Sequence, residues 1–186
     1  SNVGIVAKSN FQSLMDHVGS GSAYDLSKRR SNLSILPPYD GKAFSSFVET
    51  IYNMHGYIEH CREEYVLISQ GNVITNIDYT DVFDFHSKKK ADITLIYKNH
   101  AIPQGYDRPI TLDVDNDGKV NQIFVKPGVV DKGVFNHAYG SILIKKDLLM
   151  SEIRNAISVN QLDVRRLIQS SLGKYSIYAY ENKGYC

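Results

Sequence analysis

The chain has 186 residues and a formal net charge of +1, because 21 lysine and arginine residues nearly balance 20 aspartate and glutamate residues. No strong positive field favours nucleic acid or an anionic membrane as a partner, and no apolar run is long enough to cross a bilayer. Cys61 and Cys186 stand far apart and in no metal-ligand spacing, so the composition favours a reduced, cytoplasmic protein with one α/β domain.

The first elements are a strand and a helix. Residues 3–7 form a short apolar run, and residues 10–18 carry apolar side chains at helical spacing, so we predict a strand, a turn and a helix. Residues 22–40 are polar and end in Pro-Pro, which predicts a surface loop or a strand end. The apolar stripe over 44–58 predicts one long helix with His55 on its core-facing side.

The next segment contains the first candidate site. Residues 65–68 are apolar and not alternating, which predicts a strand buried on both faces of a parallel sheet. The turn at Gln70, Gly71 and Asn72 follows at the carboxyl end of that strand, where open α/β sheets bind their ligands. Asp78 is expected to cap the following helix, which ends at a run of lysines.

The second half of the chain continues the alternation and then changes. Strands and helices in alternation predict a Rossmann-like, mostly parallel sheet flanked by helices. A late β-hairpin interrupts this order, with a glycine-containing turn between its strands. The predicted strands are 93–97, 110–114, 120–125, 139–145 and 175–180, and the predicted helices are 148–157 and 161–172.

Familiar catalytic motifs do not explain the sequence. Residues 113–118 match the first half of a calcium loop, but Phe124 stands where a bidentate glutamate is required, so we interpret the string as a hairpin turn. No histidine pair has zinc-helix spacing, and neither G-x-S-x-G nor a glycine-rich phosphate loop occurs. Hydrolase, metalloprotease and dinucleotide-dependent dehydrogenase functions are therefore disfavoured.

Six strings in order resemble the glucose-1-phosphate adenylyltransferases of bacterial glycogen synthesis, and the regulatory, GlgD-type subunit most of all. The strings are SLMDHVGSG (13–21), ILPPYDGKAF (35–44), EEYVLISQGNVITNIDYTDVFDFH (63–86), KKKADITLIYK (88–98), VKP (125–127) and YAYENKGYC (178–186). The resemblance covers essentially the whole chain. It implies a sugar nucleotidyltransferase fold, Mg²⁺ as the family's cofactor and a hetero-oligomer with a catalytic homologous subunit.

Asn72 is the main departure from that family. In catalytic members the strand ends in Leu-Ser-Gly-Asp-His, and the aspartate helps to hold the magnesium ion; this chain has Ser69 to Val73 in that place. A carboxylate is a hard anionic ligand suited to Mg²⁺, whereas the amide of Asn72 offers one carbonyl oxygen and no charge. Loss of the charge weakens stabilisation of the phosphoryl oxygens, so Mg²⁺ binding by this chain is doubtful.

Other family positions are partly kept. Gly41 stands nearest the family's Gly-Thr-Ala-Asp-Ala, Lys126 keeps the lysine of Glu-Lys-Pro, and Gly140 keeps the glycine of Ser-Met-Gly. The resemblance implies that these residues and Gly71 contact a sugar phosphate or a nucleotide. It assigns no residue of this chain a catalytic or metal-ligating role.

The ends of the chain are expected to matter for function. The resemblance implies that a first strand with a glycine-rich loop precedes Ser1, and that a second magnesium aspartate and a β-helix domain follow Cys186. The chain would then be a partial nucleotidyltransferase domain, 1–186. We expect a regulatory, catalytically weak subunit that also binds a sugar nucleotide or a small effector; the alternative is a self-sufficient sugar-nucleotide transferase that uses Mg²⁺.

Overall fold

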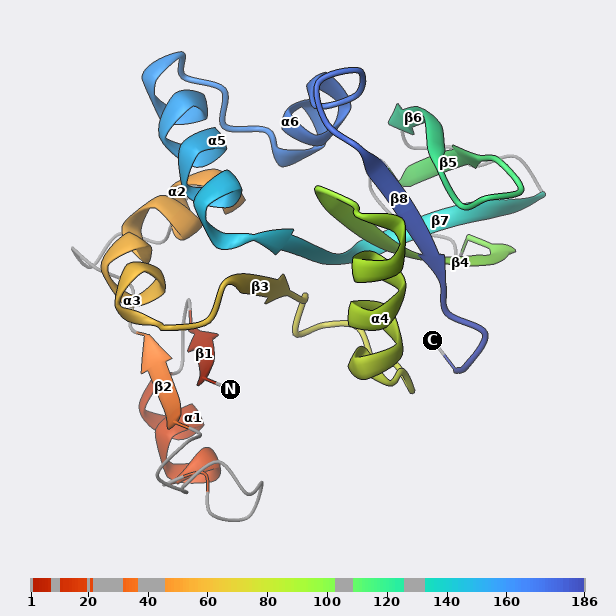
Figure 1. Ribbon diagram of the computed structural model, residues 1–186. Helices are drawn as coiled ribbons and strands as arrows, with labels where there is room; N and C mark the ends of the chain where they lie inside the picture. Colours follow the sequence, from red (N-terminus) through yellow and green to blue (C-terminus); the bar gives the residue numbers. More distant parts are fainter. Residues whose placement is uncertain are drawn as a thin grey trace. The chain divides into compact units, whose positions relative to one another are not determined.

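The computed structural model (Figure 1) describes residues 2–7, 11–19, 21, 32–36, 46–102, 109–125 and 133–185. The chain divides into two compact units: residues 1–63 with 153–163 form the first, and residues 64–152 with 164–186 form the second. Helix α5 (Lys146–Ser158) contributes residues to both units. Within the described ranges, every helix is too short or too polar to span a membrane.

The first unit begins with two parallel strands. Strand β1 (Asn2–Val6) pairs along its whole length with β2 (Asn32–Leu36). Helix α1 (Phe11–Val18) follows β1 and ends at Gly19, whose amide donates to the carbonyl of Met15 at 2.9 Å. The predicted strand and helix are confirmed, whereas the predicted turn between them, at residues 8–10, lies outside the described residues. Strand β2 ends directly before the Pro-Pro segment.

The prediction of one continuous helix over residues 44–58 is wrong. Two helices, α2 (Phe47–Asn53) and α3 (His55–His60), replace it, and Met54 between them leaves helical geometry at φ −88° and ψ 5°. The apolar stripe still faces inward on both helices, because Val48, Ile51, Met54 and Ile58 are buried. Hydrophobic periodicity identified most of the buried face, but it wrongly placed Tyr52 and His55 there and gave no sign of the break.

His55 does not lie in the core, contrary to the prediction. Its side chain is exposed, and its Nδ1 atom lies 2.8 Å from the carbonyl oxygen of Tyr52, at the junction of α2 and α3. The break at Met54 moves His55 away from the apolar face that an unbroken helix would give it. His55 therefore helps to satisfy the end of α2.

The second unit is built on a six-stranded sheet in which the order is β6-β5-β7-β4-β8 and β3 pairs with β7. Its strands are β3 (Tyr65–Ile68), β4 (Ile93–Ala101), β5 (Ile110–Val114), β6 (Val120–Val125), β7 (Val134–Lys145) and β8 (Ile177–Glu181). The α/β class with a central sheet flanked by helices is confirmed. The pairing is mixed and not mostly parallel: β4 and β8 are parallel, whereas β7 runs antiparallel to β3, β4 and β5.

Strand β3 differs from its prediction in both pairing and burial. It pairs antiparallel with β7, from Tyr65 opposite Lys145 to Ile68 opposite Ile142. Leu67 is 38% exposed, so this strand is not buried on both faces. A short apolar run indicates a strand but carries no information about the direction of its neighbour.

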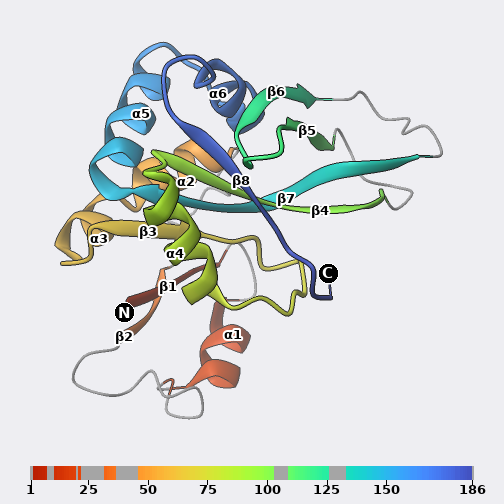
Figure 2. The same ribbon diagram turned by 45° about the vertical axis from the view of Figure 1, so that its right-hand side comes forward.

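Helix α4 (Tyr79–Lys89) covers one face of the sheet, as Figure 1 and the turned view of Figure 2 both show. Its fully buried Val82 packs with Ile96, Tyr139 and Leu143 from β4 and β7. Helix α6 (Val164–Ser170) contacts β6, where the Gln169 side chain donates to the Ile123 carbonyl at 2.9 Å. The core of this unit therefore fixes α4 against the strands that carry the candidate site.

The N-terminal cap of α4 is present as predicted. The Asp78 carboxylate accepts a hydrogen bond from the Thr80 amide at 2.8 Å, and this bond lowers the pKa of Asp78 below its usual value. We expect Asp78→Ala to lower the midpoint of thermal unfolding by about 2 to 4 °C, because the first turn loses its acceptor. Asp78→Asn should retain most of the stability in the same calorimetric scan, and equal losses for both variants would contradict a capping role.

A pair of histidines lies farther along β4 and β7. The Nε2 atom of His100 lies 3.2 Å from the Nδ1 atom of His137, and the two rings stack with centroids 5.4 Å apart. His137 is buried, with only 2% of its surface exposed. Burial, together with the neighbouring His100, lowers the pKa of His137 from 6.5 to about 4, so this imidazole is neutral at pH 7.

Candidate functional site

The turn after β3 is fixed to β7 by a side-chain contact. The hydroxyl oxygens of Ser69 and Ser141 lie 3.0 Å apart, and Gly71 and Asn72 form the turn that follows. The Asn72 side chain is exposed and makes no hydrogen bond to the described residues. The turn is therefore held by its neighbours, and the Asn72 amide does not cap it.

Gly140 lies in an irregularity of β7 beside that turn. Ile96 stands opposite Ser141 and the next residue of β4 stands opposite Ala138, so Tyr139 and Gly140 form a bulge in β7. Gly140 has φ +87°, a conformation that favours glycine. A β-carbon at Gly140 would also lie 2.4 Å from Nε2, the side-chain amide nitrogen of Gln70. The structure thus brings the turn of Gly71 and Asn72 next to Gly140.

Two of the predicted site residues, Gly41 and Lys126, lie outside the described residues. The neighbouring Val125, which replaces the family's glutamate before the lysine, is the last residue of β6. Among the predicted contacts, the structure therefore places Gly71, Asn72 and Gly140 only.

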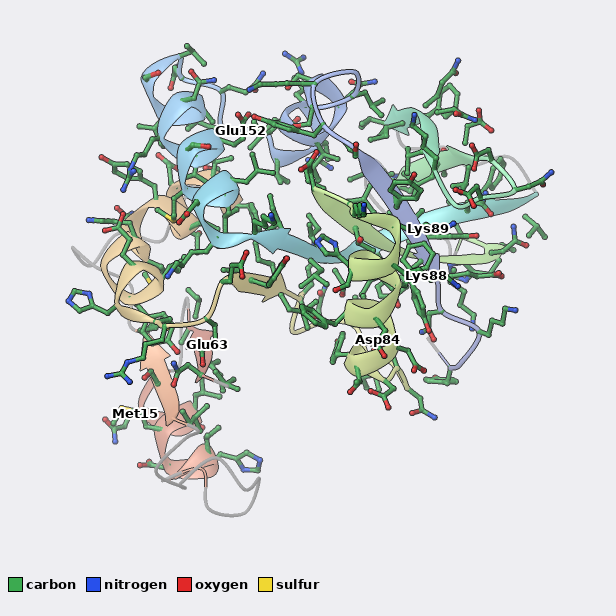
Figure 3. All side chains as sticks on the ribbon, in the orientation of Figure 1. Met15, Glu63, Asp84, Lys88, Lys89 and Glu152 are labelled. Carbon is green, nitrogen blue, oxygen red and sulfur yellow. The ribbon has the colours of Figure 1, made fainter. Side chains whose placement is uncertain are left out.

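A groove of about 650 Å³ runs beside α4 in the second unit. It is lined by α4, by the turn of the β5–β6 hairpin, by the end of β8 and by residues 182–184. Lys89, labelled in Figure 3, joins two of these walls, because its Nζ atom lies 2.5 Å from a carboxylate oxygen of Asp117 in the hairpin turn. Its ammonium also lies 5.9 Å from the ring centre of Phe85 and 5.7 Å from that of Tyr178.

Two tyrosines line the groove in the neutral form at pH 7. Burial raises the pKa of Tyr180, and the nearby carboxylates of Asp81 and Asp78 raise it further. Burial and the charge of Glu181 likewise raise the pKa of Tyr97. Both phenols therefore remain protonated and can donate hydrogen bonds, while the carboxylates beside them can only accept.

The segment after β8, residues 182–185, is a strap over the loop that precedes α4. The backbone amide of the buried Asn182 donates a hydrogen bond to the Tyr97 carbonyl at 2.8 Å, which fixes the start of the strap to β4. At the other end of the strap, the backbone amide of Asn76 donates a hydrogen bond to the Tyr185 carbonyl at 3.0 Å. The strap therefore ties the end of β8 to the loop between Asn72 and α4.

The string that resembles half a calcium loop is a hairpin turn, as predicted. The Asp115 carboxylate accepts hydrogen bonds at 2.9 Å from the amides of both Asp117 and Lys119. Gly118 supplies the positive φ of +86° that closes the turn. The Asp115 carboxylate thus stabilises the turn by accepting hydrogen bonds from its backbone.

Metal-ligating side chains are not clustered among the described residues. Within this part of the chain, no group of three or more histidine, cysteine, aspartate or glutamate side chains is arranged to hold a metal ion. At the turn after β3, the side chains of Ser69, Gln70 and Asn72 are all neutral. Magnesium prefers carboxylate and phosphate oxygens, so the donor set at this turn does not fit the ion.

The sequence placed Gln70 in the turn but gave no sign of its contact with Gly140. It also did not single out Glu181, Lys183 and Gly184, which line the groove. A usable signal existed, because a polar run directly after a predicted strand is a candidate for a ligand-binding edge. The contact between the residues that follow β8 and the loop before α4, about a hundred residues earlier in the chain, has no local sequence signature.

No family model matches the sequence. The chain is 28% identical over 193 residues to the glucose-1-phosphate adenylyltransferase of Clostridium acetobutylicum, covering 98% of this chain and 50% of the relative. It is also 28% identical over 197 residues to the Bacillus subtilis enzyme of that name, with 98% and 50% covered. The chain thus spans about half the length of these relatives.

Solved structures share the fold. A putative glucose-1-phosphate thymidylyltransferase from Bacillus anthracis, in complex with sucrose, superposes with a TM-score of 0.73 at 12% identity, over 98% of this chain and 68% of that chain. HddC from Yersinia pseudotuberculosis superposes with a TM-score of 0.65 at 15% identity, over 99% and 70%. The chain is therefore similar in sequence to glucose-1-phosphate adenylyltransferases along nearly its whole length, and it shares the fold of these solved structures.

Proposed function

We propose that the protein is a regulatory, catalytically weak subunit of a cytoplasmic glucose-1-phosphate adenylyltransferase in glycogen biosynthesis. That enzyme converts ATP and glucose 1-phosphate into ADP-glucose and pyrophosphate. The subunit would pair with a catalytic homologous subunit and bind a sugar nucleotide or a small effector. Similarity to adenylyltransferases over 98% of the chain supports the enzyme class.

The observation that carries the regulatory role is the exposed amide of Asn72. It stands at the turn after β3, where the resemblance implies a magnesium-binding aspartate, and it makes no hydrogen bond to the described residues. A local capping role therefore does not account for an amide at this place. Without a carboxylate there, the chain loses one negatively charged ligand for the ion that neutralises phosphate oxygens.

An assay of mixed subunits tests the proposal. The full-length protein would be assayed alone, the catalytic homologue alone, and the two together, each with ATP, glucose 1-phosphate and Mg²⁺. We expect little ADP-glucose from the protein alone and a changed rate or effector response in the mixture. Strong Mg²⁺-dependent activity of the protein alone would instead establish the self-sufficient transferase.

Restoring the carboxylate measures how far the site has changed. We expect Asn72→Asp to raise the Mg²⁺-dependent rate of the isolated protein about tenfold or less, equivalent to about 1.4 kcal/mol of barrier, because other charged family positions are also replaced. Asn76→Asp, which adds the same charge to the same loop, is the matched control and should give no gain. A gain of several orders of magnitude would show that the rest of the site is intact, against the proposal.

A further inference from the structure

The space directly over Gly140 is filled by the side chain of Gln70. A β-carbon at Gly140 would lie 2.4 Å from Nε2, 2.5 Å from Cδ and 2.9 Å from Cγ of Gln70. The outer half of the Gln70 side chain therefore lies across the backbone of the bulge. Gly140 is needed at this point both for its positive φ and for this close approach.

The position of this contact is one where a ligand would approach. Gly140 lies in a bulge of β7 next to the turn of Gly71 and Asn72, at the carboxyl end of β3. Bulges are common beside active sites, and a glycine within a strand commonly marks the close approach of a ligand or of another segment. Here the approaching group belongs to the chain itself.

The Gln70 backbone is fixed, whereas its side chain is free to move. The preceding Ser69 is fixed by its 3.0 Å contact with Ser141, and Ile68 is paired with Ile142. The Gln70 side chain is exposed and makes no hydrogen bond to the described residues. Packing alone holds it over Gly140, so a rotation about its side-chain bonds is enough to uncover the bulge.

We propose that Gln70 is a steric gate over Gly140, which a sugar nucleotide must displace in order to reach the backbone of the bulge. This inference rests on the proposed function, because that function supplies the class of ligand. It adds a second cause of weak substrate use: besides the missing carboxylate at Asn72, the site is partly filled by the chain's own side chain. The two causes are separable, since one concerns charge and the other concerns volume.

Calorimetric titration of the full-length protein with ADP-glucose tests the gate. Gln70→Ala removes the atoms that lie over Gly140, and we expect it to bind ADP-glucose about three- to tenfold more tightly than the unaltered protein, since no side chain has to be displaced. Gln70→Met is the matched control, because it keeps the length without the amide. It should bind about as weakly as the unaltered protein.

The outcomes separate the gate from the proposed function. Unchanged, weaker or undetectable binding by Gln70→Ala would overturn the gate, and weaker binding by both variants would make the Gln70 amide a ligand contact. The subunit assay is independent of these results, since strong activity of the unaltered protein alone overturns only the regulatory role. Equal midpoints of thermal unfolding for the unaltered protein and the two variants would show that all three are folded, so that their affinities can be compared directly.

Discussion

Replacing Gly184 with alanine is expected to lower the free energy of unfolding by about 2 to 3 kcal/mol, because the added carbon has no room. A β-carbon at Gly184 would lie 2.2 Å from the carbonyl oxygen of Asn76 and 3.1 Å from a side-chain oxygen of Asn182. The first of these atoms is backbone, so a rotamer change cannot relieve the contact. The strap must move away from the loop before α4.

That movement would also break hydrogen bonds at both ends of the strap. The Gly184 amide donates to the Asn182 side chain at 3.0 Å, and the Gly184 carbonyl accepts from the Lys98 ammonium. The bond from the Asn76 amide to the Tyr185 carbonyl spans the same contact. Each group that loses its partner while it stays buried adds to the cost of the substitution.

Urea denaturation of the Gly184→Ala variant would measure the loss. Gly71→Ala is the matched control, because a β-carbon at Gly71 meets no atom within 4 Å and its φ is not positive. We expect the control to be neutral or slightly stabilising, since alanine restricts the unfolded chain. Equal stability of the two variants would show that the strap does not pack against the loop as described.

Acidification is expected to destabilise the second unit by about 2 kcal/mol between about pH 7.5 and pH 5, through His137. Burial and His100 lower the pKa of this imidazole from 6.5 to about 4 in the folded chain. Between these two values the unfolded chain binds a proton that the folded chain does not bind. The stabilisation is therefore complete above about pH 6.5 and is lost as the pH falls toward 4.

Urea denaturation at several pH values would measure this dependence. His137→Gln removes the titrating group and keeps a polar side chain, so its free energy of unfolding should vary less over the same range. His100→Gln serves as a second variant, because it removes the neighbouring imidazole that helps to lower the pKa of His137. Identical pH profiles for the unaltered protein and His137→Gln would contradict the assignment.

The sequence predicted best those elements whose signals are local. Helix α4 was anticipated from the Asp78 cap and the lysines at its end, and the β5–β6 hairpin was anticipated from its glycine-containing turn. The break at Met54 and the direction of β3 were missed. The direction of β3 is decided by its pairing with β7, about seventy residues later, which periodicity within one segment does not reveal.

The candidate site was predicted in part for the same reason. Proximity to a strand end identified Gly71 and Asn72, and the resemblance identified Gly140, which the structure places beside their turn. Gln70 was recognised only as part of the turn, because its contact with Gly140 crosses about seventy residues of sequence. The strap over Asn76 was missed entirely, since no local pattern encodes a contact between two loops.

The strap also bears on the order in which the chain folds. Residues 73–77 are bonded to the strap through the backbone amide of Asn76 and the carbonyl of Tyr185, which lies more than a hundred residues later in the chain. Contacts at such long sequence separation form late, because a large loop must close first. During synthesis, the loop beside Asn72 therefore reaches its final shape only after β8 has left the ribosome and docked on β4.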